Sequence, residues 1–333
     1  MEQALRDDME AEGDALKVPE ERGFGKLLSP VDRTEEVEVL AEAGADELYG
    51  GVIPDSWQEG SVAVNRRSFP EAQFPDEHSF ALGIKKANAL GLPFHLTLNA
   101  PFYHPGLHEE LLALADRALG WGAAGIIVGD PGLLARLGDR HPEALLTLST
   151  MAGVMNHEAI NFFRVPGLAR VVLPRHLSLA EMASIVAGTP GFDFEAFILV
   201  GKCPNEEAYC TFQHSSPGKR WPCELSYRLY SGETREEADD ALPAVSGRKS
   251  WMCADRRMGC GLCALGHLKN LGVKIFKLVG RGGPTRGKVA NIKLARKYLA
   301  LGGGGLDARA DYEERFGRRC VREICYFPEL FRP

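Results

Sequence analysis

The stretch "GIIVGDPGLLARLGD", residues 125–139, contains the structural unit on which the fold prediction rests. Its opening residues, 125–128, form an apolar run without polar alternation, which is typical of a strand buried on both faces. Pro131 follows at the point where a helix is expected to begin, because proline is well tolerated in the first turn of a helix. The stretch therefore predicts a short parallel strand followed at once by a helix.

The same alternation of an apolar run and a helical segment recurs along the chain. The runs are "GKLLSPVD" (25–32), "DELYGGV" (46–52), "PFHLTLNA" (93–100), "GIIVGD" (125–130), "ALLTLST" (144–150), "ARVVLPR" (169–175), "FEAFILVG" (194–201) and "VKIFKLVG" (273–280). Eight strands alternating with helical segments predict the α/β class and, within it, a (β/α)8 TIM-type barrel. The alternative is a doubly wound open sheet, which usually carries a glycine fingerprint after its first strand; "SPVDRTEE" (29–36) lacks one.

Charge and hydropathy set the expected domain organisation and location. We expect an acidic N-terminal extension at residues 1–22, the barrel at 23–305 and a C-terminal extension at 306–333. The N-terminal extension lacks the apolar segment of a signal peptide, and no apolar run is long enough to span a membrane, so we expect a cytoplasmic protein. The formal net charge of −6 disfavours a large nucleic-acid-binding surface, although it does not exclude a local basic patch.

Cysteines are concentrated in one predicted loop. Six of the eight lie in residues 203–263, the long insertion between the seventh and eighth strands, on the side of the barrel where active sites form. Reducing conditions disfavour disulfides, so a metal site or a catalytic role is the better interpretation. Only Cys260 and Cys263 have the close spacing of structural zinc pairs, whereas scattered thiolates suit an iron–sulfur cluster. We expect an iron–sulfur cluster, with zinc or buried apolar thiols as the alternatives.

Several motifs occur in order and at suitable spacings between Lys26 and Ala300. They are "LLSPVDR" (27–33), "AGADELYGG" (43–51), "VAVNRRSF" (62–69), "LSTMAGVMN" (148–156), "FEAFILVGKCPNEEAYC" (194–210) and "GLCALGHLKNLGVKIFKLVGR" (261–281). In these motifs the chain resembles the collagenase-like peptidase family, number thirty-two of the U peptidases. Members of that family include bacterial proteins that hydroxylate the ubiquinone ring or tRNA uridine without oxygen.

The resemblance implies a [4Fe–4S] cluster as cofactor and assigns its ligands residue by residue. The implied ligands are Cys203, Cys210, Cys223 and Cys263. Glu195 matches a glutamate of the family signature, and we expect it to transfer protons. The chain departs from the family pattern at Leu199, where the family carries a histidine, and at Val279, where it carries a glutamate.

Polar side chains near the C-terminal ends of the predicted strands are candidates for binding a small anionic substrate or oxygen donor. They are Asn65, Arg66, Asn99, Arg175, Lys277 and Arg281. Arginine suits this role because its planar, permanently charged fork matches a carboxylate or a phosphate. The alternative is that these side chains hydrogen-bond to carbonyl groups of the loops.

These features predict an iron–sulfur protein that acts in or close to an oxygen-independent hydroxylation. The resemblance implies a prephenate-like oxygen donor, and it suggests a second family member as a heterodimer partner. One alternative is a peptidase, the historic label of the family, but no nucleophile–base pair supports it. Another is a non-catalytic iron–sulfur or zinc subunit that supports a partner, which Leu199 and Val279 favour.

The remaining cysteines leave two interpretations open. They are Cys253, Cys260, Cys320 and Cys325. Their number is sufficient for a second cluster, which would require the C-terminal segment "RRCVREICYFPEL" (318–330) to fold back over the barrel. Ordinary buried or exposed thiols are the alternative.

Overall fold

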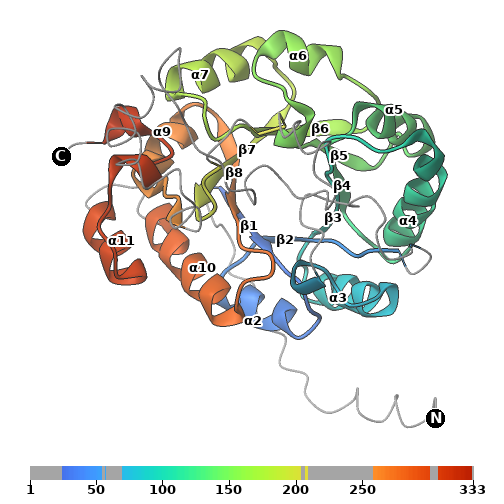
Figure 1. Cartoon of the computed structure of the whole chain (residues 1–333), viewed down its shortest axis with the longest axis horizontal. Coiled ribbons are helices and arrows are strands. Elements are labelled where there is room, and N and C mark those ends of the chain that lie inside the picture. Colours follow the sequence, from blue (N-terminus) through green and yellow to red (C-terminus); the bar gives the residue numbers. More distant parts are fainter. Residues whose placement is uncertain are drawn as a thin grey trace, which may run out of the picture.

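The computed structural model describes residues 25–54, 57, 70–203, 207–208, 258–300 and 307–331. Within them, eight parallel strands form a closed barrel in which each strand pairs with the next and the last pairs with the first (Figure 1). The strands are β1 Lys26–Pro30, β2 Glu47–Gly50, β3 Phe94–Leu98, β4 Gly125–Val128, β5 Leu145–Leu148, β6 Leu168–Leu173, β7 Asp193–Leu199 and β8 Val273–Leu278. The predicted TIM-type barrel is confirmed.

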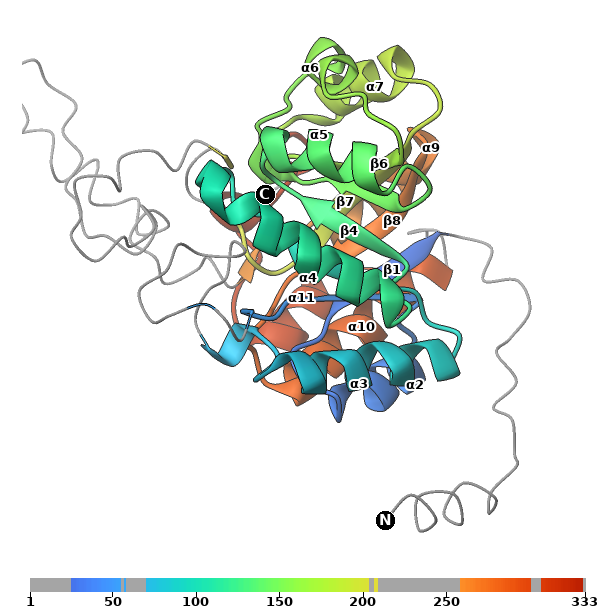
Figure 2. The same ribbon diagram turned by 90° about the vertical axis from the view of Figure 1, so that its right-hand side faces the viewer.

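Helices surround the strands on the outside of the barrel, as Figures 1 and 2 show from two directions. They are α2 Glu36–Ala43, α3 Glu77–Ala89, α4 His108–Gly120, α5 Pro131–Arg140, α6 His157–Phe162, α7 Leu179–Gly188, α9 Leu265–Asn270, α10 Thr285–Ala300 and α11 Ala308–Phe316. Short 3-10 turns are η1 Pro70–Ala72, η2 Pro105–Leu107, η3 Thr150–Ala152, η8 Leu262–Ala264, η9 Arg322–Ile324 and η10 Pro328–Leu330.

Side-chain caps fix the starts of several helices directly after strands or turns. The Asp130 carboxylate accepts a hydrogen bond from the backbone N–H of Leu133 at 2.6 Å, so α5 begins at the expected proline. Ser178 and Glu181 cap α7 reciprocally, as a capping box. Each of these helices therefore starts within a few residues of the strand end, which keeps the C-terminal rim of the barrel compact.

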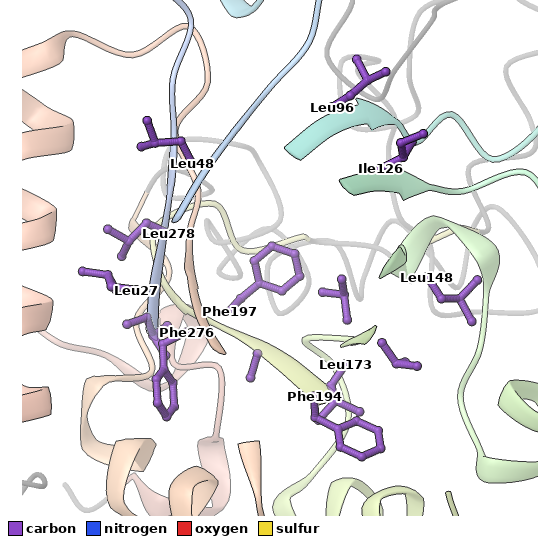
Figure 3. Close-up of a cluster of buried hydrophobic side chains, with 14 of the residues drawn as sticks. Leu27, Leu48, Leu96, Ile126, Leu148, Leu173, Phe194, Phe197, Phe276 and Leu278 are labelled. Carbon is purple, nitrogen blue, oxygen red and sulfur yellow. The ribbon is translucent and has the colours of Figure 1, made fainter. Parts of the chain in front are cut away.

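The hydrophobic core has two parts. The larger part fills the layer between the strands and the helices, and Figure 3 shows a portion of it, with labelled residues such as Leu27, Leu96 and Leu148 from strands around the barrel. The smaller part lies inside the barrel and consists of Leu28, Tyr49, Ile127 and Ile275. Other inward-facing positions carry charged or neutral polar side chains, and these define the site described below.

The C-terminal segment packs against the end of β7. Residues 258–261 extend the sheet there, because Val200 N–H donates to the Gly259 carbonyl at 2.7 Å and Gly261 N–H donates to the Ile198 carbonyl at 2.8 Å. On the other side of this segment, Cys260 forms a parallel bridge with Cys325. Helix α11 is tied to α10 through Asp311, whose carboxylate accepts hydrogen bonds from Lys297 and Tyr298.

The expected domain boundaries fall largely on residues that the structure does not describe. The acidic extension at 1–22 lies outside the described residues, as does most of the loop at 203–263. Among the helices that the structure describes, none is long and apolar enough to cross a membrane.

Candidate functional site

A buried charged cluster occupies the interior of the barrel near its N-terminal end. The Glu47 carboxylate, from the start of β2, accepts hydrogen bonds from Arg170 of β6 at 2.7 and 3.2 Å. His95 of β3 lies with its Nε2 atom 2.9 Å from the same carboxylate. Burial alone would raise the pKa of Glu47, but the hydrogen bonds from His95 and Arg170 outweigh burial and lower it below its ordinary value.

Glu195 lies in the middle of the barrel, between this cluster and the mouth. Its Oε1 atom accepts a hydrogen bond from Lys277 Nζ at 2.6 Å, and its Oε2 atom lies 3.8 Å from Arg170 Nη1. The side chain is fully buried, and Oε2 has no hydrogen-bond partner in the structure. Glu195 therefore lies deep inside the barrel, with Oε2 within ion-pair distance of Arg170 but without a hydrogen bond.

Lys277 connects Glu195 to an aromatic pair near the mouth. Its ammonium group lies 4.4 Å from the centre of the Tyr49 ring and 5.8 Å from that of Phe197. Burial lowers the pKa of Lys277, although the charge of Glu195 opposes the shift. Tyr49 and Phe197 were not predicted as site residues, but each stands two positions after an inward-facing glutamate, so strand alternation would have identified them.

Arg281 reaches across the mouth from the loop after β8. Its Nη1 atom donates to the Thr97 hydroxyl of β3 at 3.0 Å, and the residue is buried. Thr97 in turn donates to the Gly50 carbonyl at 2.9 Å. Asn99, directly after β3, is half-buried at the same end of the barrel. Arg281, from the loop after β8, and Thr97 of β3 therefore meet at this end of the barrel.

Arg175, after β6, is also at this end, but its guanidinium already has partners. It forms an ion pair with Glu207, donates to the Gly201 carbonyl and stacks on the Phe197 ring at 4.2 Å. Burial alone would lower the pKa of Arg175, but the charge of Glu207 outweighs burial and raises it. These contacts match the alternative in which a guanidinium holds the loop in place. Asn65 and Arg66 lie outside the described residues.

The start of α10, where a barrel often binds phosphate, is filled by side chains of the chain itself. Gly282 N–H donates to the Asp32 carboxylate at 2.7 Å, and Lys288 bridges Asp32 and Glu36. Burial raises the pKa of Asp32, although the charge of Lys288 opposes the shift. The carboxylates of Asp32 and Glu36 thus occupy the position in which an anionic ligand would bind. Sequence patterns do not reveal this contact, because Asp32 and Lys288 are far apart in the chain.

The expected cluster ligands are described only in part. Cys203, four residues after the end of β7, is half-buried and lies close enough to Arg175 to interact electrostatically with it. Cys263 lies in η8 and is exposed. Cys210 and Cys223 lie outside the described residues. In the part of the chain that the structure covers, no three His, Cys, Asp or Glu side chains are arranged to hold a metal ion as they stand.

Comparisons with known proteins identify similar chains. A family model for peptidase family U32 matches residues 32–302. The "tRNA hydroxylation protein P" of Escherichia coli (strain K12) is 28% identical over 185 residues, which are 56% of this chain and 38% of that protein. The "tRNA hydroxylation protein P1" of Bacillus subtilis (strain 168) is 28% identical over 216 residues, 62% of this chain and 47% of that protein.

Coverage of the relatives and similarity to a solved structure complete the comparison. The chain spans less than half the length of these curated relatives. The solved structure of the U32 peptidase Mk0906 matches with a TM-score of 0.50 and 11% identity, over 80% of this chain and 97% of that one. Identity at that level establishes the shared barrel fold alone.

Proposed function

Because this chain belongs to peptidase family U32, we propose that it acts in an oxygen-independent hydroxylation of tRNA in the cytoplasm. The observation that carries the proposal is its similarity to proteins named for tRNA hydroxylation, which covers more than half of the chain. The buried, cation-lined barrel interior supports it, since Lys277 and Arg281 offer positive charge to a small carboxylate donor of the prephenate type.

We further propose a [4Fe–4S] cluster at the mouth of β7. Its proposed ligands are Cys203, Cys210, Cys223 and Cys263, as the resemblance implies. The surroundings of Cys203 fit this role, because it is partly exposed and lies near the Arg175 guanidinium, and a nearby cation favours a thiolate. When bound, such a cluster supplies electron transfer or, with an open iron site, Lewis-acid polarisation of an oxygen atom.

The side chains in the barrel would bind and orient the small donor and move a proton. Arg281 and Lys277 would pair with its carboxylates, as a guanidinium and an ammonium group do. Glu195 would accept a proton at its Oε2 atom, which lies inside the barrel without a hydrogen bond. Tyr49 and Phe197 would exclude water from the Lys277–Glu195 pair, because both rings lie against the ammonium group.

The test is the nucleoside composition of tRNA in the host organism. Deletion of the gene should remove a hydroxylated uridine from total tRNA, as measured by liquid chromatography and mass spectrometry, and the wild-type gene should restore it. Arg281→Lys should restore at most about a tenth of the modification, because lysine cannot reproduce the guanidinium fork. Arg286→Lys is the matched control, since Arg286 is exposed in the same segment, and it should restore the modification fully.

An unchanged tRNA composition after deletion would refute this function. A second candidate is then a non-catalytic subunit that supports a second family member as a heterodimer partner. Leu199 and Val279 favour it, because they stand where the family carries polar groups, and Leu199 is fully buried in the core. Co-purification of a second family member, with activity restored only by the pair, would support that role. Hydrolysis of casein by the purified chain would favour the peptidase alternative instead.

A further inference from the structure

The middle layer of the barrel interior is polar. In a barrel of this type alternate strands contribute the side chains of one layer, and neighbouring strands are staggered by about one residue. Followed around the barrel, the strand pairings place four residues of the odd-numbered strands at one height: Leu28, His95, Thr147 and Glu195. The chain neighbours of the three polar residues, such as Leu146 and Leu148, belong to the outer core, so the polar side chains point inward.

Each of these three polar side chains has an atom without a hydrogen-bond partner among the described residues. The atoms are His95 Nδ1, Thr147 Oγ1 and Glu195 Oε2, and each residue is at most 1% exposed. In the layer below, Arg170 Nε is also buried and without a hydrogen bond. Buried polar atoms in folded proteins are nearly always satisfied, and those that the chain leaves unsatisfied are commonly satisfied by internal water.

Shared partners bring these side chains together. Glu47 Oε2 lies 2.9 Å from His95 Nε2 and accepts a hydrogen bond from Arg170 Nη1 at 2.7 Å. The same Arg170 Nη1 atom lies 3.8 Å from Glu195 Oε2. Thr147 is the register partner of Arg170 on the neighbouring strand. The four side chains therefore surround one part of the barrel interior.

Gly125 of β4 leaves one side of the His95 ring uncovered. Gly125 is the register partner of His95, and it has no side chain to place in the barrel. A Cβ atom at this position would lie 3.1 Å from His95 Nδ1 and 2.4 Å from the Leu145 carbonyl oxygen. The glycine therefore keeps a small molecule's approach to Nδ1 free of side-chain atoms from β4.

The hydrogen-bonding groups around this position are the complement of one water molecule. The pKa of Glu47 is lowered, so its ionised carboxylate only accepts, and the proton of a neutral His95 ring lies on Nε2. His95 Nδ1 and Glu195 Oε2 are then acceptors, whereas the Thr147 hydroxyl and the Arg170 Nε–H group can donate. Two acceptors and two donors match the two protons and two lone pairs of water.

We propose that one ordered water molecule occupies the middle layer, donating hydrogen bonds to His95 Nδ1 and Glu195 Oε2 and accepting one from Thr147. Lys277 binds the other oxygen of Glu195, so the ion pair and the water do not compete. The site joins the carboxylate and the imidazole from opposite sides of the layer, and it makes His95 a second proton-holding group of the interior.

The proton relay that this water provides rests on the function proposed above. After Glu195 has accepted a proton at Oε2, the water takes that proton and passes one of its own to His95 Nδ1. Glu195 is then ionised again, and the imidazolium is stabilised by the Glu47 carboxylate next to its Nε2 atom. The step moves one proton and leaves the water and the total charge unchanged.

A crystal structure of the full-length protein tests the site directly. We expect an ordered water molecule within about 3.2 Å of both His95 Nδ1 and Glu195 Oε2. A well-resolved interior in which no water bridges these two atoms would overturn the proposal.

Two substitutions at Thr147 test the same site in solution. Thr147→Val keeps the volume and removes the hydroxyl, whereas Thr147→Ser keeps the hydroxyl and removes a methyl group. If the hydroxyl binds water, the valine variant should have the lower midpoint of urea denaturation, because it leaves the water short of one donor. If the hydroxyl has no partner, packing decides and serine should have the lower midpoint. Thr147→Val at or above Thr147→Ser would overturn the proposal.

Thr189→Val is the matched control for the loss of a satisfied hydroxyl. The buried Thr189 hydroxyl already donates to the Ile185 carbonyl at 2.6 Å, so its removal needs no water to be destabilising. Its midpoint should fall below that of the wild type, which sets the scale for Thr147→Val.

The relay itself is tested by the hydroxylated uridine in tRNA of the complemented deletion strain. Thr147→Val should lower the modification about tenfold or more, and Thr147→Ser should rescue it, because the relay needs the hydroxyl and not the methyl group. Thr189→Val should leave the modification unchanged. Wild-type modification with Thr147→Val would overturn the relay. If deletion of the gene leaves tRNA unchanged, the proposed function fails, while the crystal structure and the denaturation midpoints still decide the water site.

Discussion

At the residue scale, Lys277 and Glu195 form an ion pair inside the barrel, 2.6 Å apart and almost without solvent exposure. Removing one partner leaves a buried charge without compensation, which typically costs about 3–5 kcal/mol of stability. We therefore expect Glu195→Gln and Lys277→Met each to lower the free energy of unfolding by about that amount, measured by urea denaturation. The double variant should lose less than the sum, with a coupling of at least about 1 kcal/mol.

The same two strands provide a matched control pair. Lys274 and Asp193 also lie 2.6 Å apart on β8 and β7, but both are exposed. Solvent screens an exposed pair, so the cycle of Lys274→Met and Asp193→Asn should give a coupling of about 0.2–1 kcal/mol. If the buried pair couples no more strongly than this one, Glu195 and Lys277 are not paired as described.

Because of Glu47, we expect the stability of the barrel to decrease at acid pH. Its pKa in the folded state is lowered, mainly by hydrogen bonds from His95 and Arg170 that outweigh burial, while its unfolded value is about 4.3. The stabilisation that the ionised Glu47 carboxylate provides is fully present above about pH 4.3, and it is lost as the pH falls from there through the pKa of Glu47 in the folded state. We expect the free energy of unfolding to decline more steeply below about pH 4.3 in the wild type than in Glu47→Gln.

The control for this pH dependence is Glu109→Gln. Glu109 pairs with Arg136 on the surface, with 70% of its side chain exposed, so its loss should leave the slope unchanged. Identical slopes in the wild type and Glu47→Gln would mean that His95 and Arg170 do not hold the carboxylate in its ionised form.

At the element scale, the end of β7 depends on contacts from the C-terminal segment. Val200 adopts φ +54°, a region that β-branched residues rarely occupy, and the Tyr326 hydroxyl donates to its carbonyl. Tyr326→Phe would leave that carbonyl buried without a partner, at a cost of about 1–3 kcal/mol. We expect this loss in thermal and urea unfolding, together with faster proteolysis after Phe316.

Val321→Ala serves as the comparison for Tyr326→Phe, because Val321 is exposed in the same segment. A surface substitution of this kind should change stability by less than about 0.5 kcal/mol. A Tyr326→Phe variant as stable as Val321→Ala would show that the C-terminal segment does not support the strand end.

At the scale of the whole molecule, the loop after β7 begins next to the charged interior of the barrel. Cys203 lies four residues after the end of β7, and Arg175 of the neighbouring β6 loop contacts the same turn through the Gly201 carbonyl. We therefore expect anaerobically purified protein to contain about four irons and four sulfides per chain. Alanine at Cys203, Cys210, Cys223 or Cys263 should abolish the visible absorbance of the cluster.

Two variants test whether this iron belongs to the β7 loop. Cys320→Ser should retain the iron, because Cys320 lies in the C-terminal segment after α11 and is not among the proposed cluster ligands. Arg175→Met should lower the iron content, because it removes the contacts that hold the loop. Arg286→Met should leave the iron content unchanged, because Arg286 is equally basic but exposed. Anaerobic protein without iron, or with iron that survives Cys203→Ala, would refute the cluster.

The sequence by itself determined the barrel and the positions of its strands. Runs such as 125–128 are apolar throughout, because a strand of a closed parallel barrel is buried on both faces. This burial shapes the composition of the strand itself, so it can be recognised from a few consecutive residues. Caps such as Asp130 are likewise local, because the capping side chain and the backbone N–H that it accepts from are three residues apart. The end of the barrel that carries Lys277 and Arg281 followed from the parallel strand direction.

Only the tertiary structure decided which side chains are partners. Glu47 meets Arg170 across the barrel, 123 residues away, and the Cys260 segment meets the Cys325 segment beside β7. Arg175 was expected to face a ligand but is engaged by Glu207. Pairings of this kind depend on strand register and on how the C-terminal segment docks. No local propensity encodes them, because the partners are far apart in the sequence and meet only in the folded chain.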